Sequence, residues 1–301
     1  MSEKMDKVYS MQKKIQREAN LSTSWVKDNK LMCSGSKTKL LVVGTKELRK
    51  SKLTNKGVVI EIEVDGHKVS ESQSERLLGV LINNTMTWQN HLYGNDENKG
   101  LVSKLSQRAN IIWRLSRMMP KERLNIIAEG IFLSLLNYCI EVYGNVWGLS
   151  TYDDQNRNSP ALRKEDVMKL QVLMNKVLRS LTGLPRETPV STLVARSGQL
   201  SVHQRTALFT VVSVYKSLTN KEPHYTTSTF EPRQNLLRTG RHQTNCYSVD
   251  YTLSISRGSL MYRGSKLYNQ LPSELVNISR LSEFRRGAKE WVKAKIPLLP
   301  P

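Results

Sequence analysis

Apolar residues at helical spacing in the middle of the chain constrain the fold most. From about Asp96 to Leu218 they recur every three or four positions, which predicts amphipathic helices that bury one face each. Pro120 ends one helix, and Gly183 followed by Pro185 closes another. The predicted helices are residues 101–119, 124–142, 167–181 and 208–218. Helices of this kind bury their apolar faces on one another, so we expect a helical bundle.

The N-terminal residues have a different pattern. Residues 3–27 carry apolar side chains at near-helical spacing and predict an amphipathic helix. Residues 58–64 then alternate apolar and acidic side chains, Asp65 and Gly66 form a strong turn signal, and residues 67–69 begin a return strand. A helix next to a β-hairpin is therefore expected before the bundle begins.

Two further blocks near the N-terminus indicate strands. Residues 37–44 are a basic turn, a short run rich in β-branched residues and a glycine, and residues 75–80 are a second apolar run. We predict a strand in each block. The fold class is thus α+β and mostly helical, with a partial sheet and a flanking helix first, helices next, and a mixed segment at the C-terminal end.

The order of these blocks resembles the distal palm of reverse transcriptases from retrotransposons that lack long terminal repeats. The blocks are a tryptophan ending a helix, an Asn and Leu, a Lys-Thr pair with a strand, a hairpin and a Leu-Gly-Val element: Trp25, Asn29, Leu31, Lys37, Thr38 and 78–80. The family's closing segment has its counterpart in Arg263-Gly264, Leu267-Tyr268-Asn269, Leu271-Pro272 and Phe284, with Tyr268 where tryptophan is usual. The resemblance implies distal palm at 1–92, helical thumb at 93–219 and a basic C-terminal extension at 220–301.

The resemblance also implies roles for three residues of the palm. Lys37 would lie near the incoming triphosphate, and Leu78 and Gly79 would belong to the primer grip, where glycine lets the backbone approach closely. The alternative for Lys37 is an ordinary solvated turn lysine.

Complete enzymes of this family hold two magnesium ions on paired aspartates, which the resemblance places upstream of residue 3. Two-metal chemistry needs carboxylates that converge on both ions. Tyr152-Asp153-Asp154 is similar to the catalytic signature, but the polar run at 155–160 that ends in a proline favours a solvated loop. We therefore expect no catalytic aspartates, metal or cofactor in this chain, and no polymerisation by it alone.

The charge of the chain indicates a polyanionic partner. Subtracting 26 acidic from 46 basic residues leaves a net charge of +20, which favours RNA, DNA or an RNA–DNA hybrid. No apolar run approaches the about 18 residues of a membrane-spanning helix, so no membrane partner is expected. The upstream part of the polymerase is a further candidate partner.

One basic stripe lies in the predicted thumb. Arg114, Arg117 and Lys121 are three and seven positions apart and would share a helix face opposite the apolar one. They are candidates for contacts to a duplex backbone. The alternative is an amphipathic helix with a solvated basic face.

The C-terminal residues mix cations and rings. Residues 233–295 carry twelve lysines and arginines against four acids, interleaved with tyrosines and a tryptophan, a mixture that suits single-stranded nucleic acid. Core packing is the alternative for at least half of the tyrosines. The candidate contacts are Arg238, Arg241, Arg285 and Arg286. A strand is predicted at 248–255.

Cysteine and histidine usage points away from disulfides and zinc. Cys33, Cys139 and Cys246 are few and far apart, which favours a reducing compartment. The five histidines lack ligand spacing. With a charged N-terminus unlike a signal peptide, we expect an intracellular protein, cytoplasmic or nuclear.

Two functions follow from the sequence. The first is a C-terminal fragment of a reverse transcriptase that binds primer–template or RNA without polymerising. The second is a non-catalytic nucleic-acid-binding or interaction module derived from such an element.

Overall fold

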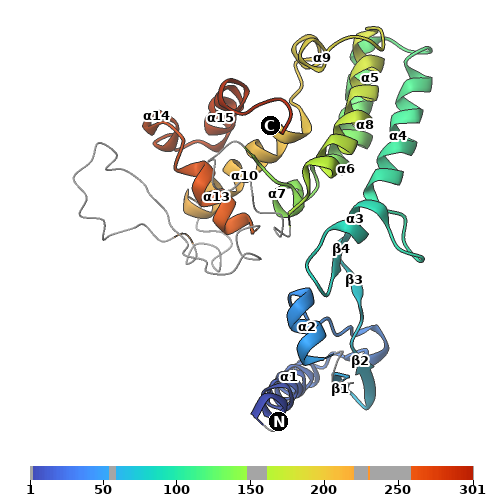
Figure 1. The fold of residues 1–301 in the computed structure, drawn as a ribbon, viewed down its shortest axis with the longest axis vertical. Helices are drawn as coiled ribbons and strands as arrows, with labels where there is room; N and C mark the ends of the chain where they lie inside the picture. Colours follow the sequence, from blue (N-terminus) through green and yellow to red (C-terminus); the bar gives the residue numbers. More distant parts are fainter. Residues whose placement is uncertain (1–2, 54–58, 148–160, 220–229, 231–258, 301) are drawn as a thin grey trace. The chain divides into compact units, whose positions relative to one another are not determined.

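The computed structural model describes residues 3–53, 59–147, 161–219, 230 and 259–300. The chain divides into two compact units, Met1–His91 (unit 1) and Leu92–Pro301 (unit 2). The described residues are mostly helical, with two small antiparallel sheets (Figure 1). The predicted α+β, mostly helical class is confirmed at this level, and palm and thumb stay predictions.

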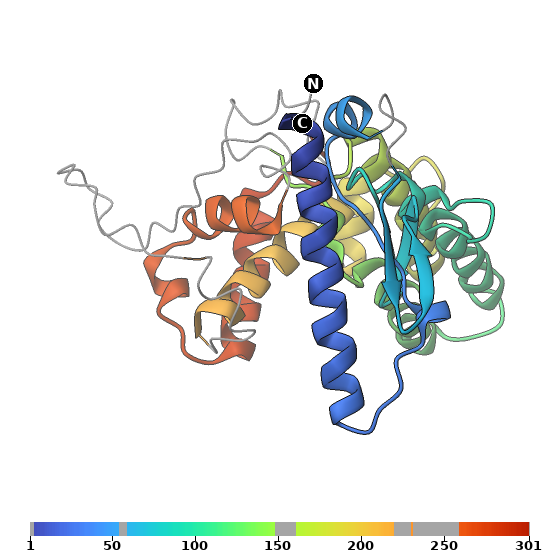
Figure 2. The same cartoon turned by 90° about the horizontal axis from the view of Figure 1, so that it is seen from below.

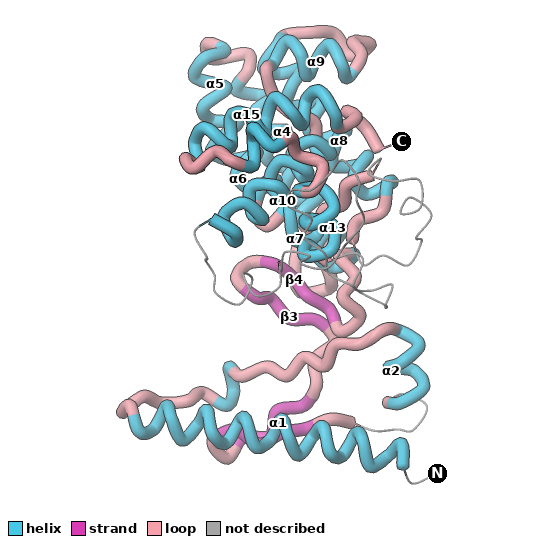
Figure 3. Tube along the Cα trace, turned by 90° about the vertical axis from the view of Figure 1, so that its left-hand side faces the viewer, coloured by secondary structure: helices cyan, strands magenta, loops and turns pink. Residues whose placement is uncertain are grey.

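Unit 1 is organised around a long helix, α1 (Glu3–Asp28), as the apolar spacing predicts. Its half-buried face carries Met11, Ile15 and Ala19, at four-residue spacing, against a small apolar core. Gln12 and Gln16 on the same helix donate to the strand carbonyls of Glu61 and Glu63, each over 2.8 Å. Helix α1 is therefore held to a β-hairpin by packing and by hydrogen bonds (Figure 3).

The first hairpin confirms the turn predicted at Asp65 and Gly66. Strand β1 (Glu61–Val64) pairs with β2 (His67–Ser70) in antiparallel register. Both turn residues have positive φ, +50° and +79°, as a two-residue type I′ turn requires. Alternate β1 side chains, Ile62 and Val64, are buried.

A second hairpin replaces the single strand predicted at 75–80. Strand β3 (Ser74–Leu77) turns through Leu78 and Gly79 into β4 (Val80–Asn83). The φ angles at the turn are +47° and +88°. The prediction was wrong because leucine rarely adopts positive φ, so its side chain gives no turn signal.

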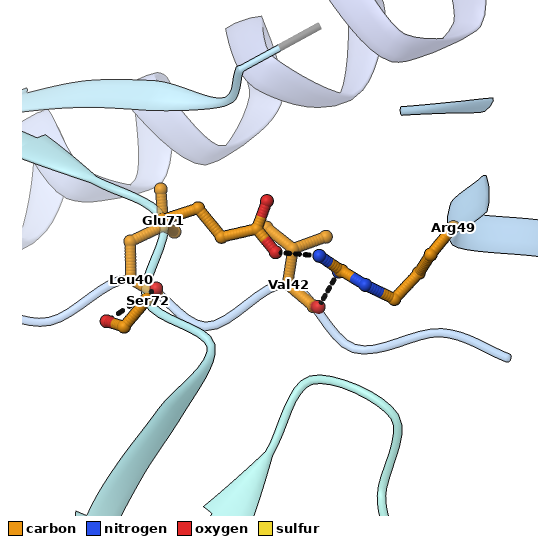
Figure 4. Close-up of polar contacts among 5 residues, drawn as sticks. All are labelled: Leu40, Val42, Arg49, Glu71 and Ser72. Carbon is orange, nitrogen blue, oxygen red and sulfur yellow. Dashed lines mark hydrogen bonds and ion pairs between the residues drawn. The ribbon is translucent and has the colours of Figure 1, made fainter. Parts of the chain in front are cut away.

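The strand predicted within 37–44 is also wrong. Residues Gly35–Lys37 form a 3₁₀ turn, and only Leu40 makes a β-bridge, to Glu71. Two residues further along, the Val42 carbonyl accepts from the Arg49 side chain of helix α2 (Lys46–Lys52) instead of from a neighbouring strand. Figure 4 shows this guanidinium joining Val42 to the Glu71 carboxylate. At Val42 a side-chain hydrogen bond therefore replaces the strand pairing that was predicted.

Unit 2 is an assembly of helices. Helix α3 (Gln89–Tyr93) spans the boundary between the units, and α4 (Leu101–Leu115) and α8 (Lys164–Thr182) pack side by side (Figure 1). Most residues of the apolar faces predicted for both helices are buried. Leu115 and Leu173 are half-buried, and Met119 lies beyond the end of α4. Gly183 caps α8 with a φ of +73°, as expected. The remaining helices are α5 (Lys121–Ile127), α6 (Ser134–Asn137), α7 (Ile140–Tyr143), α9 (Val190–Ser197), α10 (Val202–Thr219), α13 (Leu260–Tyr268), α14 (Ser273–Val276) and α15 (Leu281–Lys295).

The helix predicted at 124–142 is present but irregular. Helix α5 runs into a π-helical segment, Ala128–Leu133, and then α6, before Cys139 breaks the helix with a φ of +56°. Within the described residues, Lys121–Tyr143 is the one stretch long and apolar enough, by length and composition, to cross a membrane. The prediction that no run approaches this length was wrong. Polar residues interrupt the apolar ones in this stretch, so the sequence does not show it as one continuous apolar run. Phe132 and Leu136 of this stretch are buried inside unit 2.

Helix α10 begins six residues before the predicted position 208. Its first turns bury His203, Gln204 and Thr206, so the apolar pattern is weak there although the helix is interior. The His203 Nε2 accepts from the Trp147 amide, and its Nδ1 lies 2.9 Å from the Pro297 carbonyl oxygen. His203 is thus a core residue.

The C-terminal helices share a core with α10. Phe284 of α15 stacks on Tyr215 of α10, with ring centroids 3.9 Å apart, and Leu267 and Tyr268 of α13 are buried beside them. Figure 2 shows α13 and α15 gathered around α10. The described part of the predicted extension, residues 230 and 259–300, therefore completes the interior of unit 2. The strand predicted at 248–255 lies outside the described residues.

Candidate nucleic-acid interface

The basic surface around helix α4 follows from an acid-free run of sequence. Between Leu101 and Lys121 the chain has five lysines and arginines and no aspartate or glutamate. Helix α4 buries Leu101, Leu105, Ala109 and Ile112, so its polar positions face outward. No carboxylate of the run itself offsets the positive charge.

The structure places the three residues of the predicted basic stripe on different elements. Arg114 lies in the last turn of α4, Arg117 in the turn after it, and Lys121 at the first position of α5. All three are exposed. The expectation of one continuous helix face was wrong, because α4 ends at Leu115 before Pro120.

Lys121 differs from the two arginines in its contacts. Its ammonium donates to the carbonyl oxygen of Thr182 over 3.0 Å, at the C-terminal end of α8, where unsatisfied carbonyls favour a cation. Within the described residues, Arg114 and Arg117 make no such bond to a helix end. We therefore assign Lys121 a capping role and keep the arginines as the main candidates.

Trp113 is a residue that the sequence reasoning missed. Its side chain is 43% exposed, and the Arg117 guanidinium carbon lies 4.2 Å from the centroid of its ring. This distance is well inside the range of a cation–π contact. The spacing of four residues between a tryptophan and an arginine in an acid-free segment was the available signal.

Two further exposed apolar side chains lie in the same segment. Ile111 is 48% exposed and Met118 is 80% exposed. We call Ile111, Trp113, Arg114, Arg117 and Met118 the α4 surface. It combines a flat ring, two guanidinium groups and apolar area, which suits contact with both phosphates and bases.

The C-terminal candidates form a different surface. Arg285 and Arg286 are exposed on α15, and the Arg285 guanidinium carbon lies 5.7 Å from the Phe209 ring centroid. Figures 1 and 2 show α15 and α4 at opposite sides of unit 2. These arginines therefore do not extend the α4 surface. Arg238 and Arg241 lie outside the described residues.

Two arginines are buried and belong to the interior. Burial lowers the pKa of Arg205 and of Arg263 to about 10, which still leaves both charged at neutral pH. Arg263 donates to the carbonyl oxygens of Glu141 and Val142, and Gly264 beside it lets α13 approach α10, since a Cβ there would lie 2.7 Å from Val214 Cγ2. The Arg263-Gly264 motif thus has a packing role.

A tyrosine cluster also lies in unit 2. The Tyr93 hydroxyl donates to Asp166 over 2.5 Å and accepts from Lys169 over 3.0 Å. Burial and the bond to Asp166 raise the pKa of Tyr93. The hydroxyl therefore keeps its proton at neutral pH, and the cluster connects α3 to α8.

The palm candidates lie in unit 1. Lys37 is exposed at the end of the 3₁₀ turn, and Leu78 and Gly79 are exposed at the tip of the β3–β4 hairpin. Leu78 is 83% exposed. Its left-handed backbone conformation is uncommon for leucine.

No group of three or more potential metal ligands is found in the part of the chain that the structure describes. Asp153 and Asp154 lie outside that part. Cys33 and Cys139 are half-buried free thiols.

Comparisons with protein-family models, with curated proteins and with solved structures found no match to this chain.

Proposed function

We propose that this chain binds nucleic acid through the α4 surface, with an RNA–DNA hybrid or a primer–template as its ligand. The observation that carries the proposal is the acid-free run from Leu101 to Lys121, which presents Arg114 and Arg117 on one exposed surface. Positive charge without interspersed carboxylates is the electrostatic footprint of phosphate binding. The net charge of +20 adds a favourable long-range field.

The finer form of the proposal is a reverse-transcriptase fragment. In that form unit 1 is distal palm, unit 2 is thumb with its C-terminal extension, and Lys37, Leu78 and Gly79 face the primer and triphosphate side. It is supported by the order of the sequence blocks and by the exposure of these three residues. A non-catalytic nucleic-acid-binding module is the second candidate, and the same acid-free surface favours it equally.

Salt dependence of binding tests the shared part of both forms. Affinity for an RNA–DNA hybrid should fall linearly with salt on logarithmic axes, by about 0.9 for each phosphate neutralised on a duplex. Changing Arg114, Arg117 and Lys121 together to Gln should reduce the slope by about 1.8, because Lys121 is held by Thr182. The single variant Lys121→Gln should then change the slope little.

A control variant removes the same charge elsewhere. Lys14, Lys50 and Lys68 are exposed in unit 1, and their combined change to Gln lowers the net charge equally. This variant should keep most of the salt slope. If both triple variants reduce the slope by the same amount, net charge alone drives binding and the α4 surface has no special part.

Primer extension separates the two forms. The purified chain should not incorporate nucleotides on an RNA template with magnesium or manganese, and incorporation that disappears when Asp153 and Asp154 become Asn would make this chain a polymerase by itself. Extension restored by adding the upstream part of a polymerase would favour the fragment. No extension with that part present would favour the non-catalytic module.

A further inference from the structure

The Trp113–Arg117 pair is one of several cation–ring contacts in the described part of unit 2, and it lies in the acid-free run. Its guanidinium lies over an aromatic ring at 4.2 Å, and the ring is 43% exposed although it belongs to a large apolar residue. Exposing tryptophan in water forgoes the stabilisation that burial would give, so the arrangement favours contact with a further flat group.

We propose that the Trp113–Arg117 pair is a stacking site for one unpaired base of a single strand. This inference rests on the proposed function, because it assigns the base contact of the same α4 surface. The indole and the planar guanidinium both offer flat, polarisable faces, and aromatic rings and arginines are the groups on which unpaired bases stack.

Two neighbouring features fit a nucleotide more closely than a protein segment. Arg114 supplies a second exposed cation beside the pair, which would meet a backbone phosphate while the base stacks. The run around the pair contains no carboxylate to pair with a basic partner. A nucleotide complements this surface, because its phosphate is negatively charged and its unpaired base is planar.

Helix α4 also gives the pair a fixed spacing. Trp113 lies in the last turn of α4 next to the buried Ile112, and the Arg117 amide donates to the Arg114 carbonyl oxygen over 3.3 Å. From this turn the Arg117 guanidinium reaches the Trp113 ring. The site is therefore assembled before a ligand binds, which lowers the entropy cost of stacking.

Two strands of equal length test the inference: an oligothymidylate and a strand of abasic nucleotides with the same number of phosphates. The parent protein should bind both with the same salt slope and the oligothymidylate more tightly. Trp113→Ala should weaken oligothymidylate binding by about 5- to 100-fold and leave abasic binding and the salt slope unchanged.

Conservative variants separate stacking from other losses. Trp113→Phe keeps a ring and should retain most of the affinity for oligothymidylate, whereas Arg117→Lys keeps the charge but loses the planar group and should weaken it. Ile111→Ala is the matched control, because Ile111 is 48% exposed on the same helix and has no ring. It should bind both strands as the parent does. Quenching of tryptophan emission by oligothymidylate should be smaller in Trp113→Phe than in the parent.

Four outcomes would overturn the inference. Oligothymidylate affinity unchanged in Trp113→Ala would remove the base contact, and equal losses on both strands would show that Trp113 supports the surface without stacking. A loss in Ile111→Ala as large as in Trp113→Ala would indicate a general apolar surface, such as one for a protein partner. If the parent binds neither strand nor the hybrid, the proposed function fails with it, whereas abasic and hybrid binding that persists leaves that function in place.

Discussion

The two units hold themselves together in different ways. Unit 1 has a small apolar core beneath α1 and relies on side chains that bond to backbone, such as Gln12 and Gln16 on β1 and Arg49 on the Val42 carbonyl. Unit 2 buries helix against helix, with aromatic residues from distant segments at the centre. The comparison teaches that the stability of unit 1 depends on a few polar contacts, and that of unit 2 on packing.

The dependence of unit 2 on packing is tested most strongly at Phe284. Its ring is buried and stacked on Tyr215 at 3.9 Å. Changing Phe284 to Ala should lower the free energy of unfolding of unit 2 by about 3–5 kcal/mol, from lost burial and the cavity left behind. Urea unfolding followed by circular dichroism measures the loss, and hydrogen exchange assigns it to a unit.

The matched control for Phe284 is Tyr215→Phe. This change keeps the stacked ring and removes only the hydroxyl, which donates to the Ile278 carbonyl oxygen over 2.6 Å. The expected loss is about 1 kcal/mol. A loss for Phe284→Ala no larger than the control's would mean that unit 2 does not depend on this aromatic contact.

The polar half of the comparison is tested at Arg49. Its guanidinium bonds to both Glu71 and the Val42 carbonyl, and the two side chains are only 16% and 13% exposed. Changing Arg49 to Met leaves a half-buried carboxylate and a carbonyl without this partner. Unit 1 should lose about 1–3 kcal/mol of unfolding free energy, measured by urea unfolding with hydrogen exchange of β2.

An exposed ion pair serves as the control for Arg49. Arg280 and Glu283 in unit 2 lie 3.6 Å apart and are 79% and 47% exposed. Arg280→Met should cost about 0–0.5 kcal/mol, since water already solvates both charges. Equal effects at the two positions would contradict the dependence of unit 1 on its half-buried pair.

Local signals account for the parts of the fold that the sequence predicted. The apolar faces of α1, α4 and α8 depend on spacing within one helix, and the turn at Asp65 and Gly66 depends on two residues that accept positive φ. Each of these features is decided by neighbours in sequence, so one chain is enough to find them.

Tertiary environment explains the parts that the sequence missed. The start of α10 was hidden because its buried residues include His203 and Gln204, whose partners lie far away in sequence. The burial of Arg263 gave no local signal for the same reason, because its partners are the Glu141 and Val142 carbonyls. Of the candidate site, the cations Arg114 and Arg117 were found from spacing, but the contact of Arg117 with Trp113 needed the structure.

The two hairpins of unit 1 allow a final and smaller test, within one unit. Both turns have two residues at positive φ, but the first is Asp65-Gly66 and the second is Leu78-Gly79. Asparagine and aspartate accept this conformation, whereas leucine pays a steric cost. Leu78→Asn should therefore raise the unfolding free energy of unit 1 by about 0.5–1 kcal/mol.

Leu77 supplies the control for this test, because it is also exposed but lies in β3. Leu77→Asn should be neutral or destabilising, since asparagine is disfavoured in strands. The urea midpoints of both variants, together with hydrogen exchange of β4, measure the two changes in the stability of unit 1. Equal shifts would show that the conformation at Leu78 costs nothing. A stabilised Leu78→Asn that binds primer–template more weakly than the parent would instead tie this costly, exposed leucine to the primer-side role proposed for the hairpin, because strain is kept where function needs it.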